Sequence, residues 1–179
     1  MNKKNSVFIA TSLDGYITDK NGGIDWLNST PNPNNDDMGY IEFTNAIDAI
    51  VMGRKTFETV CGFDGEWPYT KPVFLLSGTL NKVPKSHDEK VFLVKGTLTE
   101  ILEQIYEQGY YHLYIDGGTT IQNFLKADLI DEMRITTIPI LLGGGSPLFS
   151  ELPKALKFEL VKAKTYLNQL TQNHYQRKQ

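Results

Sequence analysis

IVMGRKTFE, from Ile50 to Glu58, is an apolar run that ends at a glycine and is followed at once by two cations and a threonine. The run from Ile50 to Met52 is typical of a buried strand, and Gly53 lets the backbone turn tightly. The segment from Arg54 to Thr56 begins a predicted helix, whose free N–H groups and positive dipole end favour an anion. The stretch therefore predicts a strand, a glycine turn and a phosphate-binding helix, although cations beside a strand are often only solvated.

The same order of elements occurs a second time. Tyr110 to Ile115 is predicted as a strand, Asp116 to Gly118 as a tight turn and Thr119 to Lys126 as a helix. Two such turns at the carboxyl ends of neighbouring parallel strands could bind the two phosphate regions of one dinucleotide. The alternative is that these glycines serve only the packing of helix against strand.

Two further helices are predicted. Thr97 and Glu100 form a capping box, and the apolar residues that follow keep helical spacing to a stop at Gly109. The cluster from Asn34 to Asp37 supplies an N-cap and an acidic first turn for a helix that runs to Asn45. The predicted core-facing residues of that helix are Ile41 and either Ala46 or Ile47.

The remaining segments predict a sheet. Strands are expected at residues 6–12, 72–77, 91–94 and 132–142. Leu156, Phe158 and Leu160 alternate with other residues and, with a turn near Asn168, predict an antiparallel terminal hairpin. Strand and helix alternation followed by a hairpin predicts an α/β protein with a mostly parallel sheet and an antiparallel edge. One domain over residues 1–179 is expected.

The composition favours a small-molecule partner. A chain of 179 residues with 40% apolar content can bury a full core, and its net charge of -3 comes without the basic stripe that nucleic acid requires. The single cysteine, Cys61, excludes an internal disulfide and fits a reducing cytosol. No run of 18 apolar residues occurs, so we expect a cytoplasmic protein that does not enter the membrane.

Several common sites are excluded. Arg54 stands between Gly53 and Lys55, so the Walker A order is absent, and no G-x-G-x-x-G follows the first strand. Cys61 has no neighbouring base and is expected to be a packed thiol. No metal is predicted, because the histidines lie on separate segments without carboxylates or cysteines at ligand spacing. These histidines are His87, His112 and His174.

Six motifs occur in an order that resembles a known family. They are ATSLDGYI (10–17), a loop tryptophan, VMGRKTFE (51–58), LLS (75–77), IDGGTTIQNF (115–124) and ITTIPILLGGGSPLF (135–149). Together they resemble the dihydrofolate reductase fold superfamily, in particular the reductase domain of bacterial riboflavin-biosynthesis deaminase-reductases and its stand-alone relatives. Asp116 before only two glycines, and LLGGGSPLF, favour that branch over true folate reductases. The resemblance covers nearly the whole chain and implies a three-layer αβα fold.

The resemblance implies NADPH as the cofactor. In the family pattern Ala10 and Ile17 line the nicotinamide pocket. The pyrophosphate and the adenosine 2′-phosphate would be held by Gly53, Arg54, Lys55 and Thr56, with Leu76, Ser77 and Lys95 beside them. From the other side the pyrophosphate would meet Gly117, Gly118, Thr119 and Thr120. This set suits a 2′-phosphate, because arginine supplies a planar fork and the hydroxyls add donors.

The resemblance also implies a proton source. A gapless count back from Met52 places Asp37 where folate reductases carry the acid that relays a proton, with Thr136 as its partner across the pocket. The alternative is that Asp37 only caps a helix. Trp26 would shield the nicotinamide as part of a mobile lid, or else anchor its loop. Asp14 is interpreted as a turn residue.

The sequence leaves two substrate classes for the predicted reductase. Folate enzymes hold the glutamyl carboxylate with an arginine where this chain has Lys71, which disfavours folate. The first hypothesis is an NADPH-dependent reductase, similar to 5-amino-6-(5-phosphoribosylamino)uracil reductase, that acts on a C=N or C=O bond of a small heterocycle. A dihydrofolate reductase is the alternative, and a dinucleotide-binding protein without turnover is a second. Relatives in the riboflavin branch commonly dimerise, so a homodimer is one option.

Overall fold

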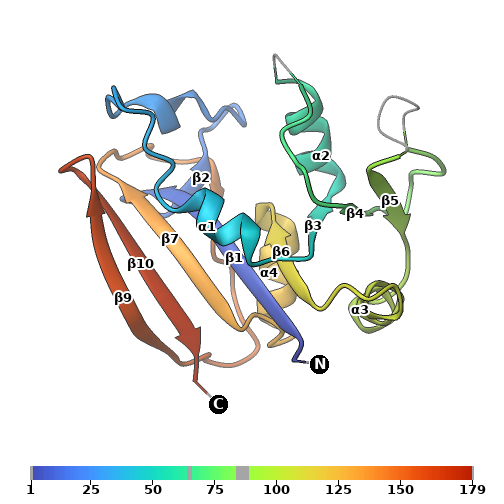
Figure 1. The fold of residues 1–179 in the computed structure, drawn as a ribbon. Helices are drawn as coiled ribbons and strands as arrows, with labels where there is room; N and C mark the ends of the chain where they lie inside the picture. The colour runs from blue at the N-terminus through green and yellow to red at the C-terminus, as the bar shows by residue number, and fades with distance from the viewer. Residues whose placement is uncertain (1, 64–65, 84–88, 179) are drawn as a thin grey trace.

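The computed structural model describes residues 2–63, 66–83 and 89–178. They form an eight-stranded sheet in the order β5-β4-β3-β6-β1-β7-β10-β9 and a small sheet of β2 and β8 (Figure 1). The strands are β1 (Lys4–Ser12), β2 (Tyr16–Thr18), β3 (Ala49–Gly53), β4 (Val73–Leu76), β5 (Val91–Val94), β6 (His112–Asp116), β7 (Glu132–Ile138), β8 (Ser146–Pro147), β9 (Phe158–Tyr166) and β10 (Leu170–Arg177). The helices are α1 (Tyr40–Asn45), α2 (Arg54–Cys61), α3 (Leu98–Glu107) and α4 (Gly118–Lys126), with a 3-10 helix η1 (Asp25–Asn28).

The sheet is parallel from β5 to β7 and antiparallel at its carboxyl-terminal edge. β4 pairs in parallel with β5 and β3, β6 with β3 and β1, and β1 with β7. β10 is antiparallel to both β7 and β9. Leu167 and Asn168 adopt left-handed φ values of 50° and 57° in the hairpin turn. The predicted mostly parallel α/β sheet with a terminal hairpin is therefore confirmed.

Helices cover both faces of the parallel strands, which gives the three layers (Figure 1). Along β3, Ile50 and Met52 pack in the core beneath α1 and α2, whereas Ala49 and Val51 pack in the core beneath α3 and α4. All four side chains are buried, because a strand between two helical layers faces apolar surroundings on both sides. The predicted capping box of α3 is also confirmed, since the Thr97 hydroxyl accepts from the Glu100 amide while the Glu100 carboxylate accepts from the Thr97 amide.

Helix α1 begins later than predicted. The sequence placed its start in the cluster from Asn34 to Asp37, but the first helical residue is Tyr40. Met38 and Gly39 have φ values of 54° and 85°, and left-handed residues cannot continue a right-handed helix.

The buried side of α1 also differs from the prediction. Ile41 is 63% exposed, whereas Phe43 is 1% exposed and packs against Phe8 and Tyr114. Ile47 is buried as predicted. Ile41 lies two residues before Phe43 and therefore on nearly the opposite side of the helix, which faces solvent.

Two local predictions are corrected. β7 ends at Ile138, before Pro139, and does not reach residue 142, because proline has no N–H for the ladder. Cys61, in the last turn of α2, is exposed rather than packed. Within the described ranges no helix is long and apolar enough to cross a membrane.

Candidate functional site

The two glycine turns lie side by side. β3 and β6 are neighbouring parallel strands, and their register pairs Met52 with Asp116. Gly53 therefore leads into α2 at the same edge of the sheet at which Gly117 leads into α4. The amino ends of both helices, with their free N–H groups, lie together at the carboxyl ends of the strands, where a phosphate is favoured.

A threonine in the first turn of each helix lies against the glycine of the other turn. A Cβ at Gly117 would overlap the hydroxyl of Thr56, and a Cβ at Gly53 would lie 3.0 Å from the hydroxyl oxygen of Thr120. Gly117 also has a φ of 89°, which side chains rarely adopt. The structure thus brings Gly53, Thr56, Gly117 and Thr120 into one constellation, and both turns need glycine.

The remaining cofactor candidates surround this constellation. A Cβ at Gly118 would lie 2.6 Å from the Cδ1 atom of Ile17, so the predicted nicotinamide pocket adjoins α4. Ala10 packs in the small core around Trp26. Leu76 ends β4 and is partly buried, while Thr119 and Lys55 are exposed in the first turns of their helices.

Arg54 is exposed and reaches toward the loop after β4. Its Nε donates to Glu58 at 2.6 Å, and its Nη1 donates to the Thr79 hydroxyl at 3.3 Å. The Ser77 hydroxyl oxygen lies 3.5 Å from that of Thr79. Lys95 is also exposed, and its Nζ donates to Asn81 of the same loop at 3.4 Å. Two cations, Arg54 and Lys95, and the hydroxyls of Ser77 and Thr79 therefore lie around the loop after β4, on the exposed side of α2.

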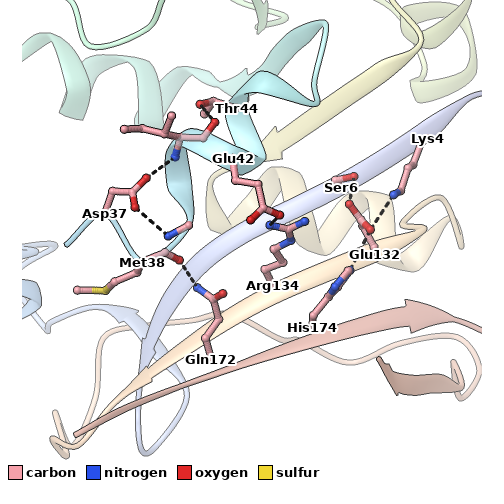
Figure 2. Close-up of polar contacts among 12 residues, drawn as sticks. Lys4, Ser6, Asp37, Met38, Glu42, Thr44, Glu132, Arg134, Gln172 and His174 are labelled. Carbon is pink, nitrogen blue, oxygen red and sulfur yellow. Dashed lines mark hydrogen bonds and ion pairs between the residues drawn. The ribbon is translucent and has the colours of Figure 1, made fainter. Parts of the chain in front are cut away.

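Asp37 and Thr136, the two residues predicted for proton transfer, are not joined by a hydrogen bond in the described part of the chain. Asp37 is exposed, and its carboxylate accepts from the amides of Gly39 at 3.1 Å and Ile41 at 2.6 Å (Figure 2). The Ile41 and Gly39 amides lower the pKa of Asp37. Thr136 is buried in β7. Asp37 thus binds backbone N–H groups at the start of α1, even though it precedes the helix.

Asp116 is an acid that the sequence reasoning did not single out as a proton donor. It is partly buried at the end of β6, and its carboxylate accepts from the Tyr69 hydroxyl at 3.2 Å. Burial raises the pKa of Asp116. The pKa of Tyr40 is raised to about 12 by the burial of Tyr40 itself and by the charge of Asp116. The alternation of side chains along β6 could have indicated this position from the sequence, because it places Asp116 on the same face of the strand as Tyr114, beneath α1.

Trp26 and Asp14 fix loops around the site. Trp26, on η1, is 8% exposed and packs with Ile138, Tyr166 and Leu170, and within the described residues its indole N–H has no hydrogen-bond partner. This packing favours the anchor interpretation, and the lid role stays a prediction.

Asp14 joins the turn after β1 to a distant loop by hydrogen bonds. Its carboxylate accepts from the Ser12 hydroxyl at 2.6 Å and from the amides of Leu142 and Gly143 at 3.1 and 2.7 Å. These hydrogen bonds lower the pKa of Asp14. A Cβ at Gly145 would overlap the carbonyl oxygen of Thr18, so the glycine-rich loop is fitted closely to β2.

The histidines form no metal centre in the part of the chain that is described, where no group of three or more His, Cys, Asp or Glu side chains could hold an ion. His174 contacts Glu132 at 2.9 Å in a polar cluster with Lys4 and Ser6 (Figure 2). His87 lies outside the described residues.

A family model and two curated relatives each match more than nine tenths of the chain. The family model of the RibD C-terminal domain matches residues 4–171. The uncharacterised protein YwjB of Bacillus subtilis (strain 168) is 35% identical over 99% of both chains, and YyaP of the same organism is 28% identical over 93% of this chain and 91% of its own.

Solved structures of the same fold include three informative neighbours. A protein of Shewanella sp. PV-4, provisionally assigned to riboflavin biosynthesis, is 57% identical, with a TM-score of 0.96 over 98% of this chain and 99% of its own. The deaminase-reductase of Thermotoga maritima has a TM-score of 0.75 at 18% identity, and this chain covers 57% of it. The dihydrofolate reductase of Enterococcus faecalis, complexed with NADP(H), has a TM-score of 0.67 at 18% identity over 98% of this chain and 97% of its own. The last two show the fold alone.

Proposed function

The chain belongs to the RibD C-terminal domain family, and from this premise we propose that it is an NADPH-dependent reductase. Its reaction would be hydride transfer to a C=N or C=O bond of a small heterocyclic substrate. The substrate class is suggested by the Thermotoga maritima relative, whose name includes 5-amino-6-(5-phosphoribosylamino)uracil reductase. The cofactor is suggested by the Enterococcus faecalis relative, which was solved with NADP(H).

The observation that carries this proposal is the paired helix ends. Thr56 lies over Gly117 while Thr120 lies over Gly53, so the amino ends of α2 and α4 face one small region. Two sets of unpaired N–H groups and two hydroxyls there suit the pyrophosphate of a dinucleotide. The glycines let the two turns approach each other closely, so that both helix ends can face one anion.

The residues around the helix ends fit the rest of the cofactor. Arg54, Lys55, Ser77 and Lys95 would hold the 2′-phosphate, because together they offer cations and hydroxyl donors at the open side of α2. Ile17 would line the nicotinamide pocket beside α4. When bound, NADPH supplies the hydride, and the protein's part is to orient it and to provide a proton.

We assign the proton to Asp116 in preference to Asp37. Reduction of a C=N or C=O bond leaves negative charge on the heteroatom, which a partly buried acid can protonate. Burial raises the pKa of Asp116, which favours its protonated form, whereas backbone amides lower the pKa of Asp37 and favour its ionised form. Asp37 stays the competing candidate, since it lies near Thr136 through Met38 and Gln172.

Replacing Arg54 by alanine is expected to weaken NADPH binding by about thirtyfold and NADH binding by less than about threefold, because only NADPH carries the 2′-phosphate for a charge-assisted hydrogen bond. Titration of both cofactors by tryptophan fluorescence measures this. Arg54 also pairs with Glu58 at 2.6 Å, so Glu58→Ala is the matched control. Equal losses for the two cofactors, or the same loss in Glu58→Ala, would assign Arg54 to helix stability instead.

The proposed function is tested with a substrate panel. The wild-type protein is mixed with NADPH and, in turn, with the aminouracil ribosylphosphate, dihydrofolate and simple pterins, and NADPH oxidation is followed by absorbance. Oxidation with the aminouracil is the expected result. Oxidation with dihydrofolate alone would select the folate alternative, binding without any oxidation would select a non-catalytic protein, and no binding of either cofactor would refute the dinucleotide site.

A further inference from the structure

Gln172 connects Thr136 on β7 with the backbone segment that carries Asp37. It lies in β10 and is 8% exposed. The sheet register places Ala10 beside Thr136 and Thr136 beside Gln172, so the three residues form one row across β1, β7 and β10. Ala10 and Thr136 are the residues predicted for the nicotinamide pocket and for proton transfer. Gln172 is therefore the next residue outward along the sheet.

The amide nitrogen of Gln172 makes two hydrogen bonds. It donates to the hydroxyl oxygen of Thr136 at 2.9 Å. It also donates to the carbonyl oxygen of Met38 at 3.0 Å (Figure 2). A primary amide has two N–H groups, and both are used here. Among the described residues, no other side-chain atom donates one hydrogen bond to β7 and another to the segment before α1.

The bond to Thr136 sets the direction of its hydroxyl. A threonine hydroxyl has one hydrogen and can accept as well as donate. Because the oxygen accepts from Gln172, its own hydrogen must point away from the Gln172 amide. The Thr136 hydroxyl is thereby left to donate its hydrogen to a partner other than Gln172. Without Gln172 the hydroxyl could rotate, and its hydrogen would take several directions.

The bond to Met38 holds the backbone that carries Asp37. Met38 has a φ of 54° and Gly39 a φ of 85°, so two consecutive left-handed residues follow Asp37. Such a conformation for a methionine needs support from its surroundings. That support comes from one side by the Asp37 carboxylate, which accepts from Gly39 and Ile41, and from the other by Gln172.

We propose that Gln172 is a positioning residue of the reductase, which fixes the Thr136 hydroxyl as a donor and holds the Asp37 segment at the edge of the reacting region. This inference rests on the proposed function. Gln172 itself does not transfer a proton. It acts through Thr136 and through the backbone at Met38, so its loss should reduce turnover and leave the phosphate-binding helix ends intact.

The test compares Gln172→Leu with Gln176→Leu, an exposed glutamine on the same strand. Gln172→Leu is expected to lower kcat by about ten- to a hundredfold, because the Thr136 hydroxyl and the Met38 carbonyl lose a buried hydrogen-bond donor, with NADPH affinity changed less than about twofold. Gln176→Leu should leave both unchanged. Hydrogen exchange at the amides of Gly39 and Ile41 should accelerate only in the Gln172 variant, because the turn loses its support.

A double-mutant cycle separates positioning from general damage. If Gln172 acts in part through Thr136, then the losses in kcat from Thr136→Val and Gln172→Leu should be clearly less than additive in the double variant. Gln172→Glu, which keeps the shape but loses the donors, should match Gln172→Leu, and it serves as the second variant if the leucine protein does not fold.

Two outcomes would count against the inference in different ways. Absence of turnover by the wild-type protein across the panel would overturn the proposed function and this inference together. A wild-type enzyme that turns over, with unchanged kcat in Gln172→Leu or fully additive losses in the cycle, would overturn the role of Gln172 alone.

Discussion

Asp116→Asn is expected to lower kcat for NADPH-dependent reduction by about a hundredfold or more, since general acid catalysis contributes that much. Asparagine has the same shape and can still accept the hydrogen bond that Tyr69 donates at 3.2 Å, but it has no acidic proton. NADPH affinity should change little, because the helix ends begin after residue 116. Steady-state kinetics and cofactor titration measure the two effects separately.

The pH dependence supplies a second test of Asp116. Burial raises its pKa above the ordinary value of 3.8, so the protonated form persists to higher pH than for an exposed aspartate. Wild-type kcat should therefore be high below this raised pKa and fall as the pH rises through it. In Asp116→Asn that fall should disappear. A variant Asp37→Asn that loses both turnover and the fall, while Asp116→Asn keeps them, would move the proton source to Asp37.

The stability of Asp116→Asn distinguishes chemistry from misfolding. A group whose pKa is raised on folding stabilises the native state fully below its unfolded pKa, and this contribution is lost as pH rises through the folded pKa. Above that range the buried carboxylate is a liability, so the asparagine variant should be at least as stable as the wild type at neutral pH. Thermal unfolding measures this. Lower activity together with lower stability would point to a structural defect.

Gly117→Ala is expected to destabilise the fold by about 3 kcal/mol or more and to weaken NADPH binding at least tenfold. Its φ of 89° strains any side chain, and the new Cβ would overlap the Thr56 hydroxyl, which would push the amino ends of α2 and α4 apart. Denaturant unfolding and cofactor titration measure the two losses.

Gly109 provides a matched control for Gly117. It also has a φ of 89°, but a Cβ there would meet nothing within 4 Å. Gly109→Ala therefore reports the backbone strain alone, about 1 kcal/mol, and should leave cofactor binding unchanged. If Gly117→Ala destabilises no more than Gly109→Ala, then the contact between the two turns is not tight. Adding Thr56→Ala to Gly117→Ala should recover part of the lost stability, because it removes the overlapping hydroxyl.

The sequence by itself determined the local units. Strand, glycine turn and helix at Gly53 and at Gly117, the capping box at Thr97 and the hairpin turn near Asn168 all appear where predicted. These features depend on neighbouring residues, through backbone φ preferences, side-chain caps and hydrophobic period, so a linear pattern carries them. The ordered motifs likewise identified the family, whose model spans residues 4–171.

Only the tertiary structure decided how those units meet. β3 and β6 are adjacent although β4, β5 and α3 lie between them in sequence, and that crossover alone places Thr56 over Gly117. The contact of the partly buried Asp116 with Tyr69, the link from Gln172 to Met38 and the exposure of Ile41 and Cys61 are also products of packing between distant segments. A side chain's pKa, hydrogen-bond partner and exposure depend on what lies across the sheet, and local sequence does not encode that neighbour.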